Sequence, residues 1–89
     1  MRTELMCMIL RALKDGPKGV RAIQRWIAQN YNHKMSFSTL RGYLRRMKEL
    51  GFVERYEGAC PVCGRKLPYP LWGITVLGSL WLDFPSEVG

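Results

Sequence analysis

The segment from Ser36 to Leu50, SFSTLRGYLRRMKEL, constrains the fold of this chain more than any other. Its apolar residues recur at steps of three and four, the period that places them on one face of an α-helix. Ser36 has the side-chain oxygen preferred at a helix N-cap, and Gly51 follows where a helix end favours left-handed backbone geometry. The inward positions are Phe37, Leu40, Leu44, Met47 and Leu50. The outward positions are Ser38, Thr39, Arg41, Gly42, Arg45 and Arg46.

The outward face of this helix combines small hydroxyl residues at its start with arginines further along. Such a face suits insertion into a DNA major groove, where these side chains can reach base edges. Any basic amphipathic helix with a solvated cationic face shows the same pattern, so the helix alone supports both interpretations. The segments on either side must decide between them.

Two more helices are predicted before this segment. Thr3 is a candidate cap for the first, which runs to about Lys14, and the glycine and proline of residues 15–19 form a loop after it. The second helix runs from about Lys18 or Gly19 to Asn30. The expected inward residues are Met6, Ile9, Leu10 and Leu13 in the first helix and Val20, Ile23 and Ile27 in the second.

After Gly51 the period of the apolar residues changes from helical to twofold. Residues 52–56 and 69–74 are predicted strands, and the loop between them makes a hairpin with a long tip. Pro70 then belongs at a strand start or edge, where its missing N–H is not needed. Thr75 can cap a last helix over residues 76–84 that ends at Pro85.

Eighty-nine residues are expected to form one domain, residues 1–89, near the lower size limit for a single core. The first helix is apolar over more than half of its circumference, and the last one is apolar nearly all round. So much apolar surface favours a homodimer formed through the first and last helices. The alternative is that both helices only close a small core.

Charge is distributed unevenly along the chain, whose formal net charge is +7. Residues 1–50 contain 11 basic and 3 acidic residues, a net charge of +8, whereas residues 51–89 contain 3 and 4, a net charge of −1. The helical half therefore favours an anionic partner. No apolar run approaches the roughly 20 residues of a membrane span, so we expect a cytoplasmic protein.

The order of these elements resembles that of a winged-helix DNA-binding domain. Residues 38–55, STLRGYLRRMKELGFVER, are similar to the recognition helix and first wing strand of small winged-helix transcriptional regulators of the PadR or MarR kind. Residues 71–75, LWGIT, followed by Val-Leu-Gly, are similar to the second wing strand and the start of the closing helix. The resemblance covers about residues 4–82. It implies an α+β winged helix-turn-helix with three helices, a two-stranded wing and a C-terminal helix.

The resemblance also implies which residues contact double-stranded DNA. Facing the major groove or its flanking phosphates would be Ser36, Ser38, Thr39, Arg41, Gly42, Arg45 and Arg46. The second helix would contact the DNA backbone through Lys18, Arg21 and Arg25. The wing, residues 57–69, would reach the adjacent minor groove or backbone with Arg65 and Lys66.

The sequence Cys60-Pro-Val-Cys63-Gly in the wing departs from this family pattern. Two cysteines at this spacing form half of a zinc site, but a structural zinc needs four ligands. Cys7 and His33, or the same segment of another subunit, are candidates for the missing pair. A disulfide or a reduced thiol pair between Cys60 and Cys63 is an equal alternative.

Two classes of function remain after this survey. The first is a sequence-specific, double-stranded DNA-binding transcriptional regulator. The second is a winged-helix module for protein interaction that docks through its last helix. An enzyme is not expected, because the single histidine, the scattered carboxylates and the absence of a phosphate-binding glycine loop supply no catalytic constellation.

Overall fold

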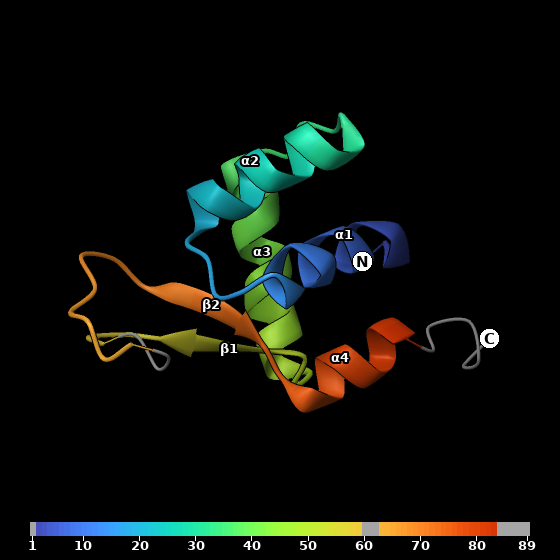
Figure 1. Ribbon diagram of the computed structural model, residues 1–89. Helices are drawn as coiled ribbons and strands as arrows, with labels where there is room; N and C mark the ends of the chain where they lie inside the picture. Colours follow the sequence, from blue (N-terminus) through green and yellow to red (C-terminus); the bar gives the residue numbers. More distant parts are fainter. Residues whose placement is uncertain (1, 60–62, 84–89) are drawn as a thin grey trace.

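The computed structural model describes residues 2–59 and 63–83, which form four helices and a two-stranded antiparallel sheet (Figure 1). In chain order the elements are α1 (Thr3–Lys14), α2 (Val20–Tyr31), α3 (Phe37–Glu49), β1 (Val53–Tyr56), β2 (Leu71–Ile74) and α4 (Val76–Asp83). The predicted α+β order is therefore confirmed. None of the helices in the described ranges is both long and apolar enough to cross a bilayer.

Local chemistry at the helix ends explains most of these boundaries. The Ser36 hydroxyl accepts a hydrogen bond from the Thr39 backbone N–H at 3.2 Å, which caps α3 as predicted. Gly51 ends the same helix with a φ of +86°. The predicted cap at Thr3 is wrong, because α1 begins one residue earlier, and Arg2 at its N-cap position makes no side-chain hydrogen bond to the helix.

The core lies where α1, α2 and α3 meet the base of the hairpin (Figure 1). Leu40, Leu44 and Met47 on α3 have no exposed surface. Phe37 and Leu50, which were also predicted to face inward, are 38% and 44% exposed. They lie at the two ends of α3, Phe37 as its first residue and Leu50 at its C-cap. The buried side chains are Leu5, Met6, Ile9, Leu10, Ala12, Leu13, Ile23, Ile27, Met35, Leu40, Leu44, Met47, Val53 and Leu82.

The hairpin is the wing of the fold, and its strands pair in a register from Val53 opposite Ile74 to Tyr56 opposite Leu71. Pro70 immediately precedes β2, as predicted for a residue without an N–H. Lys18 adds an unpredicted third strand position at the other edge of β2. Its N–H donates to the Trp72 carbonyl at 2.9 Å, and its carbonyl accepts from the Trp72 N–H at 2.8 Å. The loop before α2 thus holds the wing against the helices.

Helix α4 follows β2 after one residue and packs against α1. The Thr75 hydroxyl accepts from the Gly78 N–H at 3.0 Å, which confirms the predicted cap, and donates to the Gly51 carbonyl at 2.6 Å. An ion pair of 3.0 Å between Lys14 and Asp83 joins α1 to α4. The predicted end of this helix at Pro85 lies outside the described residues.

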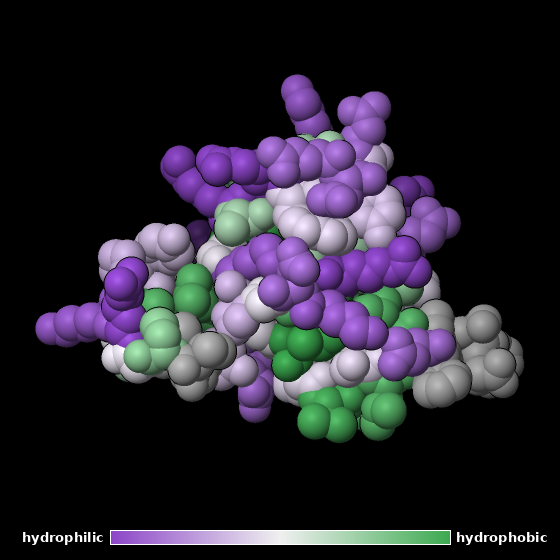
Figure 2. Space-filling model, in the orientation of Figure 1, coloured by the Kyte–Doolittle hydropathy of each residue, from purple (hydrophilic) through white to green (hydrophobic). Residues whose placement is uncertain are grey.

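One side of α4 is apolar and faces solvent. Val76, Leu77 and Leu80 are 78%, 51% and 53% exposed. Figure 2 shows the corresponding green area at the lower edge of the molecule, below the hydrophilic surface that covers α2. The extra apolar width of α1, in contrast, is used within the chain, because Leu5 and Ala12 are buried among α1's neighbours.

Candidate nucleic-acid interface

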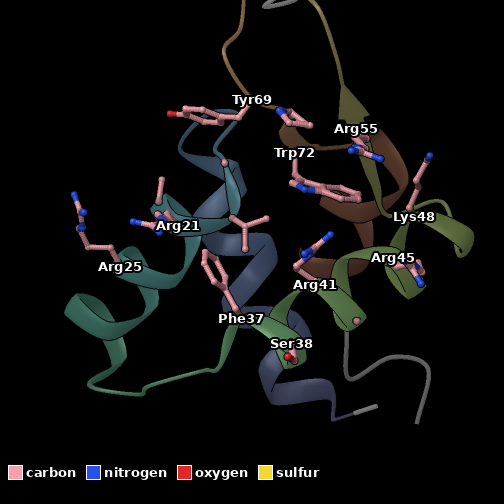
Figure 3. Close-up of a pocket in the computed structure, with 15 residues that line it drawn as sticks. Arg21, Arg25, Phe37, Ser38, Arg41, Arg45, Lys48, Arg55, Tyr69 and Trp72 are labelled. Carbon is pink, nitrogen blue, oxygen red and sulfur yellow. The ribbon is translucent and has the colours of Figure 1, made fainter.

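A cleft of about 1000 Å³ lies between the start of α2, the outer side of α3 and the wing (Figure 3). Each of these three elements supplies one wall. The lining residues are Gly19, Val20, Arg21, Ala22, Arg25, Phe37, Ser38, Arg41, Gly42, Arg45, Lys48, Arg55, Tyr69, Pro70 and Trp72. We call this cleft the basic groove.

The α3 wall of the basic groove consists of a stripe of exposed residues. Ser38, Arg41, Arg45 and Lys48 follow one another at steps of three and four, so the helical period brings them to one side. Gly42 lies within this stripe, and a Cβ added there would meet no other atom within 4 Å. Lys48 was not predicted, although its position three residues after Arg45 would have indicated it.

The α2 wall carries Arg21 and Arg25, which lie one turn apart as predicted. Gly19 is the N-cap residue of α2 and has no side chain that could accept a hydrogen bond. The first backbone N–H groups of α2 are therefore not satisfied by a side chain. A shallower hollow continues on the outer side of α2, where Lys34 joins Arg21 and Arg25. Lys34, in the turn after α2, therefore extends the row of cations beyond the basic groove.

The wing wall is formed by residues that sequence analysis missed: Arg55 on β1, Trp72 on β2, and Tyr69 and Pro70 just before β2. Arg55 pairs with Glu57 at 3.1 Å and lies over the indole ring of Trp72. The alternation of the strand offered a signal for Arg55, because it lies two residues after the buried Val53 and so shares the side of the strand that turns toward the helices.

The electrostatics of the basic groove are one-sided. Its cations are Arg21, Arg25, Arg41, Arg45, Lys48 and Arg55, and no Asp, Glu, His or Cys is among the described residues that line it. Arginine keeps its charge at any physiological pH. Arg55 pairs with Glu57 beside the groove, and the other five cations make no ion pair among the described residues. This excess of cations creates a local positive potential that attracts a polyanion.

Several predicted contact residues lie outside the basic groove. The Lys18 ammonium donates to the carbonyls of Ala12 at 2.6 Å and Gly16 at 3.4 Å, so it caps the end of α1. Lys18 does not line the basic groove, and its role as a DNA contact stays a prediction. Arg46 is directed to Glu49 at 3.4 Å on another side of α3.

The remaining predicted residues lie near the rim. Ser36 and Thr39 are exposed at the start of α3, where the Ser36 hydroxyl also donates to the Thr39 hydroxyl at 2.9 Å. Arg65 and Lys66 are exposed on the wing, next to the backbone bridge between Ala59 and Lys66. None of these four side chains lines the groove.

The cysteines are dispersed over the part of the chain that the structure describes. Cys60 lies outside the described residues, and Cys63 is exposed on the wing. Cys7 is half-buried on α1, and this burial raises the pKa of its thiol, while the charge of Arg11 lowers it to a smaller extent. Within residues 2–59 and 63–83, no three His, Cys, Asp or Glu side chains form a group that could hold a metal ion.

Comparison with known proteins gives fold neighbours only. No protein-family model matches the sequence, and no curated protein matches it. Solved structures do match: a candidate transcriptional regulator from Thermoplasma acidophilum superposes with a TM-score of 0.73 at 23% identity, covering 96% of this chain and 80% of the other. A PadR family transcription regulator from Clostridium difficile gives 0.73 at 15% identity, with coverages of 94% and 84%.

Bacillus subtilis PadR, solved in complex with operator DNA, also superposes with a TM-score of 0.73, at 20% identity. The match covers 90% of this chain but only 45% of that PadR chain. These similarities confirm the winged helix-turn-helix fold and its likeness to PadR regulators. The basic groove lies between the helix-turn-helix and the wing of that fold.

Proposed function

We propose that this chain is a sequence-specific, double-stranded DNA-binding transcriptional regulator. In this proposal residues 36–50 enter the major groove, and the wing, residues 57–69, contacts the adjacent minor groove or backbone. The observation that carries it is the basic groove itself: six cations from α2, α3 and β1 with no carboxylate among its described lining residues. Folding alone would favour interspersed anions on such a surface, so the unbalanced charge supports an anionic partner.

The shape of the α3 surface supports a duplex as that partner. A B-DNA major groove is about 12 Å wide and admits one α-helix. The stripe from Ser38 to Lys48 is exposed along the helix, so it can face base edges while Arg21 and Arg25 lie beside the flanking phosphates. Arg65 and Lys66 are exposed further along the wing, where a neighbouring minor groove would pass.

Selection from a random DNA pool tests the proposal directly. We expect enrichment of a near-palindromic site, because a dimer presents two copies of α3. Binding should weaken by about 10³ to 10⁵ between 50 and 200 mM salt, the loss expected for about six to ten phosphate contacts. Absence of any duplex binding at 50 mM salt would contradict the proposal, and equal binding to all sequences would reduce it to a nonspecific DNA contact.

We further propose that a second copy of the chain covers the exposed apolar side of α4. This side of α4 gathers three exposed apolar residues, Val76, Leu77 and Leu80. Exposed apolar residues of a monomer are usually scattered singly, and a contiguous group is typical of an interface. The wing and α4 point away from each other (Figure 1), so pairing through α4 leaves the basic groove of each copy open. Because α1's apolar surface is buried within the chain, we assign the main contact to α4 rather than to both helices.

Replacing Leu80 with Glu tests the dimer. The half-exposed side chain contributes little to the monomer core, so the variant should keep its helical circular dichroism but run as a monomer in light scattering. Its affinity for a palindromic site should then fall by at least tenfold, because the two half-sites are no longer bound together. A monomeric native protein would instead argue against the dimer.

The same apolar surface favours a second candidate function, a protein-interaction module that docks through α4. That alternative predicts a monomer that ignores duplex DNA at low salt. The chemistry of the basic groove supports binding rather than catalysis, since no histidine, cysteine or carboxylate is among its described lining residues. We accordingly propose a non-enzymatic protein that acts in the cytoplasm.

The chemistry of the wing cysteines is addressed by measuring zinc content together with free thiols. Cys60 lies outside the described residues, so zinc and a disulfide or reduced thiol pair stay equal alternatives. The wing points away from α4, which argues against one zinc shared between the two wings of the proposed dimer. Well under one zinc per chain would exclude a zinc site. Three titratable thiols would then indicate a reduced pair at Cys60 and Cys63, and one would indicate a disulfide.

A further inference from the structure

Two arginines of the basic groove lie over aromatic rings that come from neighbouring elements. The guanidinium carbon of Arg21 on α2 is 5.8 Å from the centroid of the Phe37 ring, at the start of α3. The guanidinium carbon of Arg55 on β1 is 5.9 Å from the centroid of the Trp72 ring on β2. Both separations lie within the range in which the negative face of a ring attracts a cation.

Burial explains only part of the placement of these rings. Phe37 has the helical spacing of a core residue, yet it is 38% exposed and lines the groove. Trp72 is partly buried against the core, its backbone N–H and C=O both bond to Lys18, and Arg55 is its cross-strand neighbour. Each ring therefore forms part of a groove wall with an arginine above it (Figure 3).

We propose that Phe37 and Trp72 are positioning residues of the DNA interface, and that each holds one arginine ready for a phosphate. The inference rests on the proposed DNA-binding function. A free arginine loses side-chain freedom when it binds a phosphate, whereas an arginine that already lies on a ring has lost part of it beforehand. A cation–π contact gives the guanidinium no hydrogen-bond acceptor of its own, so its N–H donors stay available for a phosphate.

The Arg21–Phe37 pair offers the cleaner test of the two. Arg55 also pairs with Glu57 at 3.1 Å, so its position has a second cause, whereas no side-chain hydrogen bond or ion pair of Arg21 occurs within the described residues. Phe37 contributes less to the core than the fully buried residues of α3. Its replacement by Leu should therefore leave a folded protein, which thermal unfolding verifies.

The test is a double-mutant cycle on the full chain, measured as fluorescence anisotropy of a labelled duplex at one low salt concentration. We expect Phe37→Leu to weaken DNA binding by about two- to fivefold, the equilibrium equivalent of an exposed cation–π contact. In the Arg21→Ala background, the same Phe37→Leu substitution should change affinity by less than about 1.5-fold, because the arginine that it positions is gone. Arg21→Lys should lose part of the affinity despite its retained charge.

Two further measurements separate positioning from a general structural role. Arg46→Ala is the matched control, because Arg46 is on α3 but outside the groove, and Phe37→Leu should weaken binding equally with or without it. Arg21→Ala should reduce the slope of log affinity against log salt by about 0.9, the value for one lost phosphate contact, and Phe37→Leu should reduce it by less. The salt slope would not change if Phe37 acted only on stability.

The outcomes distinguish this inference from the function on which it rests. If the native chain binds no DNA, the proposed function and the positioning role both fail. If the native chain binds DNA but Phe37→Leu costs the same in both Arg21 backgrounds, only the positioning role is overturned. The corresponding cycle for Arg55 uses Trp72→Phe and Trp72→Leu, and we expect Phe, which keeps an aromatic face, to retain more affinity than Leu.

Discussion

The two faces of α3 differ in burial and in charge. On the inner face Leu40, Leu44 and Met47 are fully buried, whereas on the outer face Arg41 and Arg45 are exposed in the basic groove. The inner face is satisfied within the chain, since its neighbours surround it completely. The outer face has gathered like charges with no carboxylate among the described residues of the groove, a composition that the proposed DNA partner would account for.

We therefore expect substitutions on the two faces of α3 to change different properties, either the free energy of unfolding or the affinity for DNA. Substitutions on the inner face should change the free energy of unfolding and leave the affinity of the folded fraction intact. Substitutions on the outer face should do the opposite. Variants along α3 can test whether the two properties are independent.

Leu44→Ala should have the largest effect. Its side chain is completely buried, so truncation removes apolar contacts and leaves a cavity, at a cost of about 2 to 5 kcal/mol in the free energy of unfolding. Urea unfolding followed by circular dichroism measures this loss. DNA affinity, corrected for the folded fraction, should be unchanged, and a large specific loss of affinity would show that the two faces are not independent.

Arg45→Ala should leave the free energy of unfolding within about 0.5 kcal/mol, as for a surface substitution. It should cost about 1 to 3 kcal/mol of binding on the preferred sequence, if Arg45 contacts a base edge. Fluorescence anisotropy measures the affinity for the preferred duplex and for a random one. An affinity loss confined to the preferred duplex would identify a base contact, and an equal loss on both would identify a phosphate contact. Arg46→Ala, whose side chain pairs with Glu49 outside the groove, is the control and should change neither sequence preference nor stability.

Ser36 combines a structural role with a predicted binding role, since it caps α3 and is also a predicted DNA contact. Ser36→Ala should cost about 1 kcal/mol of stability through the lost cap to Thr39. Ser36→Asp keeps a good capping group and should preserve stability, but its negative charge should weaken DNA binding. Thermal unfolding and anisotropy on both variants measure the two effects, and unchanged DNA affinity of the Asp variant would remove Ser36 from the interface.

Sequence analysis predicted the inner face of α3 well, because a helical period records which side is turned inward. It could not show where the core ends, so Phe37 and Leu50 were placed inside although they lie at the two ends of α3 and are partly exposed. The third wall of the groove depends on the bridge between Lys18 and Trp72, which are far apart in the sequence. No local period reports such a contact, so neither this bridge nor the capping role of the Lys18 ammonium was predicted.

Gly42→Ala should give the smallest effect and the most direct comparison, because its two consequences have opposite signs. Glycine inside a helix is less stable than alanine by about 0.5 to 1 kcal/mol, and a Cβ at Gly42 would meet nothing within 4 Å. The variant should thus unfold at a higher temperature, since no neighbour opposes the added methyl group.

If DNA approaches α3 closely at this point, the same methyl group should weaken binding, and Gly42→Val should weaken it further. Melting temperature and duplex affinity are measured on the same samples. Lower affinity together with higher stability would indicate that the duplex uses the space above Gly42. Higher stability with unchanged affinity in both variants would mean that the duplex does not approach this part of α3, and would move the contact toward Arg45 and Lys48.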